Sequence, residues 1–219
     1  MRQVDMIFNS MLGKGKTETY TLYDYIESTG TQWIETDYLM TDETEIEGSF
    51  MFSDYDSSNS NNTIIGINQA GRSNIDRLYS DKNYGRIWCG MWRPTNTFQG
   101  TNLSLLSNIS IRISATNAQM TINNNTYNWN TGLVPLFNSG GAMSGSRLRL
   151  LSNQNNAPYN LHKVKILPFV CRENGVVVCD FRPAVRDSDG VAGTLDLLSN
   201  TFRPNANPAG ENFLYGNLT

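Results

Sequence analysis

The chain has 219 residues, of which 39% are hydrophobic and only 17% charged, as is typical of one soluble globular domain. A net charge of −3 and a pI near 5.2 disfavour general nucleic-acid binding, which needs a clustered basic surface. No apolar run approaches the ~20 residues of a membrane helix. The N-terminal apolar run is also too short for a secretory signal, so we expect no export by the general route.

Residues 1–19 form a separate lead-in that is too short for a domain. We expect it to be an arm that packs on a neighbouring molecule, or an added edge strand. The glycine-lysine repeat at 13–16 lacks the spacing and the strand-to-helix setting of a phosphate-binding loop. The domain itself is expected at 20–219.

From residue 20 onward, apolar and polar residues alternate with the period of two that is typical of strands. The expected strands are 20–26, 32–38, 44–53, 63–67, 76–80, 84–92, 109–115, 119–123, 126–129, 134–137, 148–151, 163–170, 176–181 and 212–215.

Asparagine-rich clusters between these segments indicate where the loops lie. The chain has 27 asparagines, and clusters such as 57–62, 123–125 and 152–156 predict loops, because asparagine favours turns and is poor inside strands. No long window shows a helical period. Many short strands without a helical crossover require antiparallel pairing, so the predicted fold is an all-β, two-sheet antiparallel β-sandwich of the jelly-roll type.

The strongest local signal is Asn174-Gly175, which stands between two β-branched runs. Both residues tolerate positive φ, so the pair predicts a tight hairpin. After the hairpin we expect a turn at 187–190, a short apolar piece at 195–198 and an Asn-Thr-Phe turn.

The chain has three cysteines, Cys89, Cys171 and Cys179. This number is small and odd, unlike the even sets of cysteines that form a disulfide framework. A two-residue hairpin loop would leave Cys171 and Cys179 staggered on opposite faces, whereas a three-residue loop would set them directly across from each other. We favour two free, packed thiols. No Cys-x-x-Cys or histidine cluster suggests zinc, and His162 is the single histidine.

Both ends of the domain carry a recognisable pattern. The opening pattern is YIESTGTQWIETDY at residues 25–38. The closing pattern begins with KVKI at 163–166, Asn-Gly at 174–175 and DFRP at 180–183. It continues with Arg186, Asp189-Gly190, Gly193, Leu195-Asp196, Asn200, Phe202 and Asn205. These segments resemble the opening and closing signatures of concanavalin-A-like (laminin-G-like) domains in structural proteins of tailed phages and prophages. The resemblance spans about 23–216. Residues 193–196 read Gly-Thr-Leu-Asp where the family usually has Gly-Leu-Tyr-Asp, which removes an aromatic contact.

The resemblance implies a non-enzymatic structural protein of a virion, in the head decoration, a fibre or the tail, assembled in the bacterial host cytoplasm. Its expected partners are other virion proteins and further copies of itself in a symmetric oligomer, with neither nucleic acid nor membrane insertion. In this fold the first and last segments commonly meet in one sheet, so we expect the two signatures to be spatial neighbours. The alternative function is a carbohydrate-binding adhesion module for host surface glycans, and a glycoside hydrolase ranks third.

Glu43, Glu45 and Glu47 have the spacing of paired carboxylates on a glycosidase strand. The alternative is a solvated strand face opposite Ile46 and the phenylalanines that follow it. We favour the solvated face, because the segment lacks the intervening aspartate and flanking aromatics of the enzyme pattern. No catalytic residue is predicted.

Trp88 and Trp92 share one face of the strand expected at 84–92, about 13 Å apart, and Trp129 stands in an Asn-rich hairpin. These three indoles are the candidate glycan-binding residues, because aromatic rings stack on sugars. Burial in the core or at a protein interface is the favoured alternative, and it applies to Trp33 as well.

Two loops carry several oxygen ligands, 54–61 and 187–190, and calcium takes such ligands. Neither loop has the terminal bidentate glutamate of a hand-type site. We interpret the second as a turn with an aspartate accepting backbone hydrogen bonds and a glycine at positive φ. No cofactor or metal is therefore predicted.

Overall fold

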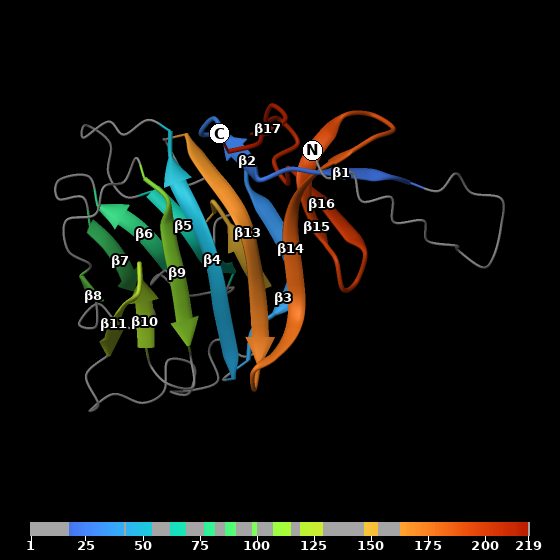
Figure 1. Ribbon diagram of the computed structural model, residues 1–219. Coiled ribbons are helices and arrows are strands. Elements are labelled where there is room, and N and C mark those ends of the chain that lie inside the picture. Colours follow the sequence, from blue (N-terminus) through green and yellow to red (C-terminus); the bar gives the residue numbers. More distant parts are fainter. Residues whose placement is uncertain are drawn as a thin grey trace.

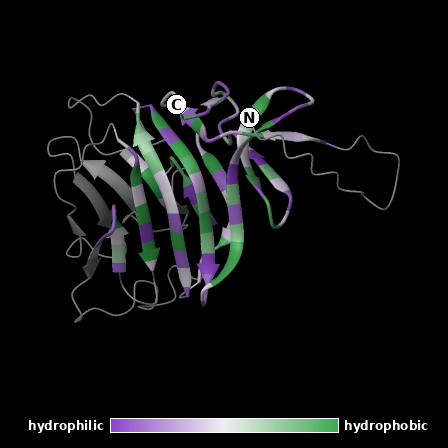
Figure 2. Ribbon diagram, viewed as in Figure 1, coloured by the Kyte–Doolittle hydropathy of each residue, from purple (hydrophilic) through white to green (hydrophobic). Residues whose placement is uncertain are grey.

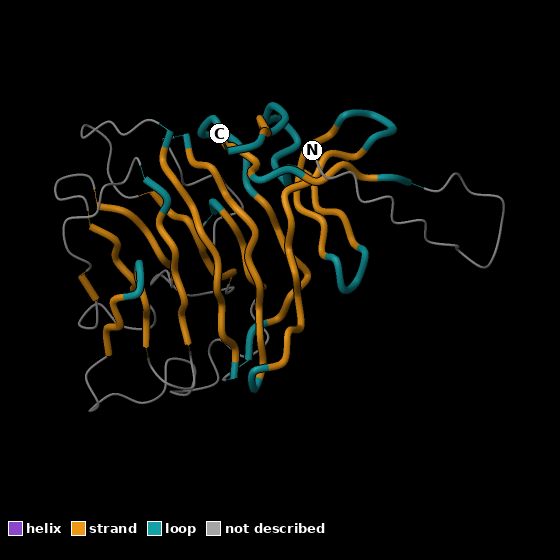
Figure 3. Tube along the Cα trace, in the orientation of Figure 1, coloured by secondary structure: helices purple, strands orange, loops and turns teal. Residues whose placement is uncertain are grey.

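The computed structural model describes residues 18–41, 43–53, 62–68, 77–81, 86–90, 98–99, 107–114, 119–128, 147–152 and 163–218. At 62, 67–68, 77–81, 86–90, 98–99 and 127–128 it describes the backbone alone. Most of the lead-in, the loop 54–61 and the strand expected at 134–137 lie outside these ranges. Figure 3 shows strands and loops in the described part. No helix there is long and apolar enough to cross a membrane.

Eleven of the described strands form one sheet. Its main path runs β11 (Asn125–Asn128), β10 (Gln119–Ile122), β9 (Ile109–Ser114), β4 (Thr44–Phe52), β13 (Val164–Glu173), β14 (Val176–Arg186), β15 (Val191–Asp196) and β16 (Thr201–Pro204). In addition, β1 (Tyr20–Leu22) pairs with β14, while β2 (Tyr25–Ser28) pairs with β13 and with β17 (Leu214–Gly216). Figure 1 shows the long strands β9, β4, β13 and β14 side by side.

The other six described strands form a second sheet behind the first (Figure 1). Its order is β3 (Ile34–Leu39), β12 (Arg147–Leu150), β5 (Asn62–Asn68), β6 (Arg77–Asp81), β7 (Arg86–Gly90) and β8 (Phe98–Gln99). Every pairing in the two sheets is antiparallel. The prediction of an all-β chain with two antiparallel sheets is confirmed.

In the larger sheet, β4 and β9 form where the sequence predicts them, because this sheet has one apolar and one polar face. On β4 the side chains of Ile46, Phe50 and Phe52 are buried, and Glu47 between them is exposed. β9 repeats this alternation with three buried isoleucines. Hydrophobic and hydrophilic positions accordingly alternate along these strands in Figure 2. A one-residue slip would turn each apolar set toward water, so the pattern specifies the register.

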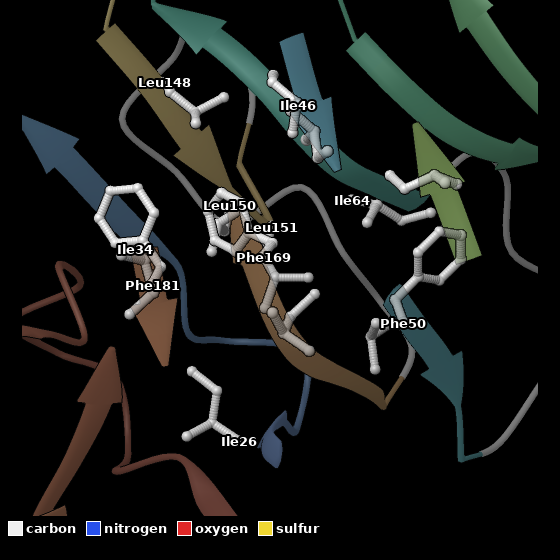
Figure 4. Packing of buried hydrophobic residues seen from close by; sticks show 14 of the residues in the cluster. Ile26, Ile34, Ile46, Phe50, Ile64, Leu148, Leu150, Leu151, Phe169 and Phe181 are labelled. Atoms are coloured by element: carbon white, nitrogen blue, oxygen red, sulfur yellow. The ribbon is translucent and has the colours of Figure 1, made fainter. Parts of the chain in front are cut away.

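The buried faces of the two sheets enclose a single hydrophobic core. Figure 4 shows Phe50, Phe169 and Phe181 from the larger sheet near Leu148 and Ile64 from the smaller one. The rings of Phe169 and Phe181 stack with centroids 4.8 Å apart. Full burial of such a side chain contributes about 1.5–3 kcal/mol, so these contacts are the main force holding the sheets together.

The predicted hairpin connects β13 and β14. Asn174 and Gly175 have φ angles of 50° and 79°, as a type I′ turn requires. The residues on either side, Glu173 and Val176, are the first cross-strand pair, so the loop has two residues.

A β-bulge follows directly after this turn. Arg172 pairs with Val177, but the next pair is Cys171 with Cys179, so Val178 is an additional residue in β14. The expectation that a two-residue loop leaves the cysteines on opposite faces is therefore wrong. The bulge returns them to the same face, directly across from each other.

The end of the signature forms a second hairpin, where the sequence predicts only a short apolar piece between turns. β15 begins at Val191, and β16 pairs with it from Thr201. Five consecutive residues of β15 are buried, from Ala192 onward, because both faces of this strand are covered. Burial on both faces removes the alternation of period two that reveals a strand.

The strand expected at 20–26 is two strands. β1 pairs with β14, whereas β2 pairs with β13, and the chain changes partner at Tyr23 and Asp24. Their backbone amides donate to the carbonyl oxygens of Pro183 (3.0 Å) and Gly216 (3.1 Å). Alternation continues through this change, so the sequence does not show it.

The two signatures lie next to each other, as predicted. Ile26 on β2 pairs with Ile166 on β13, and Ser28 pairs with Val164. The backbone amide of Ala206 donates to the carbonyl oxygen of Trp33 at 2.8 Å. The opening and closing segments therefore form one structural unit.

Candidate functional site

The turn after β2 is organised around Gln32, which is completely buried. Its Oε1 accepts hydrogen bonds from the Thr29 amide (2.8 Å) and the Ser28 hydroxyl (3.0 Å). Its Nε2 donates to the carbonyl oxygen of Asn212 at 3.2 Å. Gly30 adopts a φ of 105°, which favours glycine and lets the chain turn tightly around the amide. These bonds compensate the desolvation of a buried carboxamide.

Asn212 continues this network toward the closing signature. Its Oδ1 accepts from the Ala192 amide at 2.9 Å, and its Nδ2 donates to the carbonyl oxygen of Gly190 at 3.0 Å. One asparagine therefore connects the opening turn, through Gln32, to the start of β15.

Asp196 has a comparable role in the second hairpin. Its Oδ1 accepts from the amides of Asp180 (2.9 Å) and Leu198 (3.2 Å), and its Oδ2 accepts from the Ser199 hydroxyl (2.6 Å). The oxygen atoms of this signature residue bind its own chain. Gln32 and Asp196 are therefore buried side chains that hold the turns of their own domain.

The loop at 187–190, considered above for calcium, is a turn. Asp189 accepts from the Val191 amide at 3.1 Å, and Gly190 has a φ of 71°. Arg186 donates to both carboxylate oxygens of Asp189, at 3.0 and 2.7 Å, and these bonds lower the pKa of that carboxyl. The other candidate loop, 54–61, lies outside the described residues. Among those described, no three His, Cys, Asp or Glu side chains group as metal ligands.

The outward face of β4 carries the candidate carboxylates. Glu45 forms an ion pair with Arg112 at 2.9 Å, and Glu47 forms one with Arg172 at 2.6 Å. Glu43 accepts a hydrogen bond from the Asn174 side chain. Glu45 and Glu47 therefore lie on the face opposite the buried side chains of β4, and the preference for a solvated face over a glycosidase site stays a prediction.

A hollow of about 550 Å³ lies on this same outward face. Its lining comes from β4, β9, β10, β13 and β14 and from the β10–β11 hairpin. We call it the outer groove. Hydroxyl side chains line much of it: Ser49, Ser110, Thr121 and Thr126. Its volume falls within the range of small-ligand sites in proteins.

The hollow forms where short side chains meet a distortion of the sheet. Ser49 on β4 lies directly opposite Ser110 on β9, so two small side chains occupy the middle strands. On the other side of β4, Leu167 and Pro168 together stand opposite Ser49, which is a β-bulge in β13. Such bulges bend the strand and are frequent beside functional sites. Pro168 and Val170 form an apolar strip along this part of the groove.

The charged groups of the groove are paired. Arg182 binds Asp180 through two hydrogen bonds of 2.6 and 3.1 Å. Arg112 pairs with Glu45, and Glu47 with Arg172, as described above. Three guanidinium groups thus pair with three carboxylates, so each charged side chain of the lining has a compensating neighbour.

The candidate glycan-binding tryptophans lie elsewhere or outside the described residues. Trp88 is in β7, opposite Tyr79 and Gln99, in the smaller sheet, and its side chain is not among those described. Trp92 and Trp129 fall outside the described ranges. Their role stays a prediction.

Trp33 belongs to the core, which settles the ambiguity that the sequence leaves for this residue. It is 4% exposed, and the guanidinium of the buried Arg149 lies 4.9 Å from the centroid of its ring. Arg149 also pairs with Glu35 at 3.2 Å. This cation–π contact gives the buried charge a second favourable partner.

Cys171 and Cys179 are both buried and free, as predicted. Burial and the neighbouring Cys179 thiol raise the pKa of Cys171 well above the usual value. Since the thiolate is the reactive form, a nucleophilic role for this residue is disfavoured.

Comparisons with known proteins add little to this picture. No family model matches the sequence, and no curated protein sequence matches it. Among solved structures, the chain is similar to Scytalido-glutamic peptidase with a peptide-based transition state analog. That similarity has a TM-score of 0.43 at 13% identity and covers 69% of this chain and 85% of the other. It is too weak to support any argument about activity.

Proposed function

We propose that the protein is a non-enzymatic structural component of a bacteriophage virion. A concanavalin-A-like jelly roll would serve as a scaffold that contacts neighbouring subunits in the head decoration, a fibre or the tail. The observation that carries this proposal is the closure of the two-ended signature, in which Gln32 contacts Asn212 and Trp33 contacts Asn205.

The chemistry of the signature supports a scaffold more than a catalyst. The side chains of Gln32, Asp196 and Asn205 hydrogen-bond to backbone groups of their own domain. Side chains engaged in this way hold the chain ends together, and they are not aimed at a substrate.

An exposed apolar edge supports the expected self-association. β17 pairs with β2 on one side, and its residues Leu214 and Tyr215 are 51% and 42% exposed. Leu218, just beyond it, is 46% exposed. Apolar side chains on an edge strand favour contact with another molecule.

Immunogold electron microscopy of phage particles tests the virion proposal. An antibody raised against the recombinant chain should label intact particles, and the labelled position should identify head or tail. Antibody absorbed with the recombinant chain is the control. Purified particles that contain no trace of the chain by mass spectrometry would contradict the proposal.

Light scattering of the purified chain tests self-association. We expect one discrete oligomer, and the double variant Leu214→Ser/Tyr215→Ser should shift it toward monomer. The matched change Val176→Ser/Val177→Ser, at the exposed tip of the β13–β14 hairpin, should leave the oligomer intact. A monomer at all concentrations would count against subunit contacts between copies.

A further inference from the structure

We propose that Asn174 is a site of spontaneous covalent modification, at which the asparagine becomes aspartate or isoaspartate and water is the only other reactant. The site is the tip of the β13–β14 hairpin, at the lower end of these two strands in Figure 1. Neither residue of this turn lines the outer groove. The proposal does not depend on the location of the protein in a virion.

The reaction begins when the backbone nitrogen of Gly175 attacks the Cγ carbon of Asn174. A C–N bond forms, the bond between Cγ and Nδ2 breaks, and Nδ2 leaves as ammonia with the amide proton of Gly175. Water then opens the resulting five-membered imide. Opening at Cγ restores the normal backbone and leaves aspartate. Opening at the backbone carbonyl carbon leaves isoaspartate, in which the chain continues through Cγ.

The attacking nitrogen is accessible in the folded protein. Gly175 is exposed, and no atom lies within 4 Å of the position that a Cβ atom would occupy. Within the described residues its amide donates to no acceptor, because the two central residues of the turn lie outside the ladder of the hairpin. A side chain on this residue would hinder the attack, and glycine has none.

The β10–β11 hairpin provides an internal comparison. Its turn has the same shape, with Asn123 and Asn124 at φ angles of 46° and 68° between the paired residues Ile122 and Asn125. Here the carboxamide is held in place, because Oδ1 of Asn123 accepts from the amide (2.9 Å) and the hydroxyl (3.3 Å) of Ser110. The residue that follows also carries a side chain. We therefore expect Asn123 to be stable.

The carboxamide of Asn174 is held at one atom only in the described part of the chain. Nδ2, the atom that leaves, donates a hydrogen bond to the Glu43 carboxylate, and Oδ1 has no partner there. The Cγ carbon can therefore turn toward the backbone without breaking a bond to Oδ1. Of the two similar turns, the β13–β14 turn combines an unhindered nucleophile with a weakly held carboxamide.

The modification would release the hairpin tip from the turn that precedes β4. In the unmodified chain Asn174 contacts Glu43, and the neighbouring Glu173 accepts hydrogen bonds from the hydroxyls of Tyr38 (3.0 Å) and Thr41 (3.2 Å). An aspartate has no donor for Glu43 and places a second carboxylate against it, so the contact becomes repulsive. Isoaspartate adds a methylene to the backbone, which the two-residue turn cannot accommodate.

Peptide mapping by mass spectrometry tests the reaction with the full, folded chain in a mildly alkaline buffer. We expect the peptide with Asn174 to gain the mass that replaces NH2 by OH and to separate into two products. The peptide with Asn123 should stay unchanged. A parallel sample in denaturant shows that the conditions suffice for the reaction. Conversion at Asn174 in denaturant but not in the folded chain would overturn the proposal, as would earlier conversion at Asn123.

Two matched variants test the structural consequence. Asn174→Asp should speed amide hydrogen exchange at 173–177 by about tenfold, the effect of losing one hydrogen bond to a charged group. Asn123→Asp makes the same change in the other turn and should exchange like the parent, because aspartate keeps the oxygen that accepts from Ser110. Equal exchange at 173–177 in Asn174→Asp and the parent would contradict the release of the hairpin tip.

A double variant keeps this test decisive if Asn174→Asp does not fold. In Asn174→Asp/Glu43→Gln the new glutamine can donate to the new carboxylate, which restores the hydrogen bond with its direction reversed. Slow exchange at 173–177 should return. Exchange as fast as in a chain that lacks the contact altogether, such as Asn174→Ser, would show that the contact with Glu43 does not hold the hairpin tip.

Discussion

The backbone amide of Trp33 donates a hydrogen bond to the Oδ1 atom of Asn205, 3.2 Å away and 172 positions later in the chain. The same oxygen accepts from the Asn207 amide at 2.9 Å, and Nδ2 donates to the carbonyl oxygen of Glu211 at 2.9 Å. One side chain thus joins the opening signature to the segment after β16.

Asn205→Ala should lower the free energy of unfolding by about 1–2 kcal/mol, because the variant loses the three hydrogen bonds at once. Urea unfolding followed by tryptophan fluorescence measures the loss. Asn217→Ala, an exposed asparagine near the C-terminus, is the control and should be neutral. Equal stability of the two variants would show that the contact does not hold the ends together.

Gln32→Leu should be more damaging, by about 2–3 kcal/mol, since it leaves the partly buried amide of Thr29 and the buried hydroxyl of Ser28 without their acceptor. Gln119→Leu makes the same change at a half-buried position on β10 and should cost less. Thermal unfolding of both variants provides the comparison. A Gln32 variant as stable as the Gln119 variant would be inconsistent with the network described for this turn.

Gly193 on β15 has no room for a side chain, because a Cβ atom there would overlap with the Arg203 carbonyl group of β16. Gly193→Ala should therefore separate the strands and cost about 1–3 kcal/mol or more. Gly175→Ala meets no neighbouring atom and should cost only the strain of its positive φ, about 1 kcal/mol. Urea unfolding measures the loss of unfolding free energy in both variants, and Gly193→Ala should lose more than Gly175→Ala. A larger loss for Gly175→Ala would contradict the close contact between β15 and β16.

The thiols of Cys171 and Cys179 should not react in the folded protein. Their burial predicts that labelling requires unfolding, so a thiol reagent at a pH of about 8 should react at least ~10³-fold more slowly without denaturant than with it. The experiment uses a Cys89→Ser background, so that only these two thiols report. Rapid labelling under native conditions would mean that the core at the bulge opens readily.

Asp189 predicts a specific pH dependence. Hydrogen bonds from Arg186 are the main cause of its lowered pKa, so folding favours the carboxylate. The stabilisation is present above the ordinary aspartate pKa near 3.9, and it is lost as the pH falls through the lower pKa of the folded state. Asp189→Asn should lack this contribution, so its stability should fall less steeply than that of the parent below pH ~4. Parallel pH profiles would contradict the assignment.

Local patterns determine a large part of this fold. Alternation along 44–53 predicts β4 with its correct buried face, alternation along 109–115 predicts β9, and Asn174-Gly175 predicts the hairpin. These signals act over a few residues, through side-chain direction and through the φ angles that a turn demands. The sequence alone therefore predicts these strands and this hairpin. The resemblance to a known family added the expectation that the opening and closing signatures are spatial neighbours.

Tertiary structure decides what depends on neighbouring strands. The bulge that sets Cys171 opposite Cys179 arises from the pairing of β13 with β14, and the two-sided burial of β15 arises from strands packed around it. The sequence does not reveal the outer groove either, because the groove also depends on how neighbouring strands pair. Ser49 and Ser110 are ordinary strand residues until the antiparallel register places them side by side, next to the bulge at Pro168.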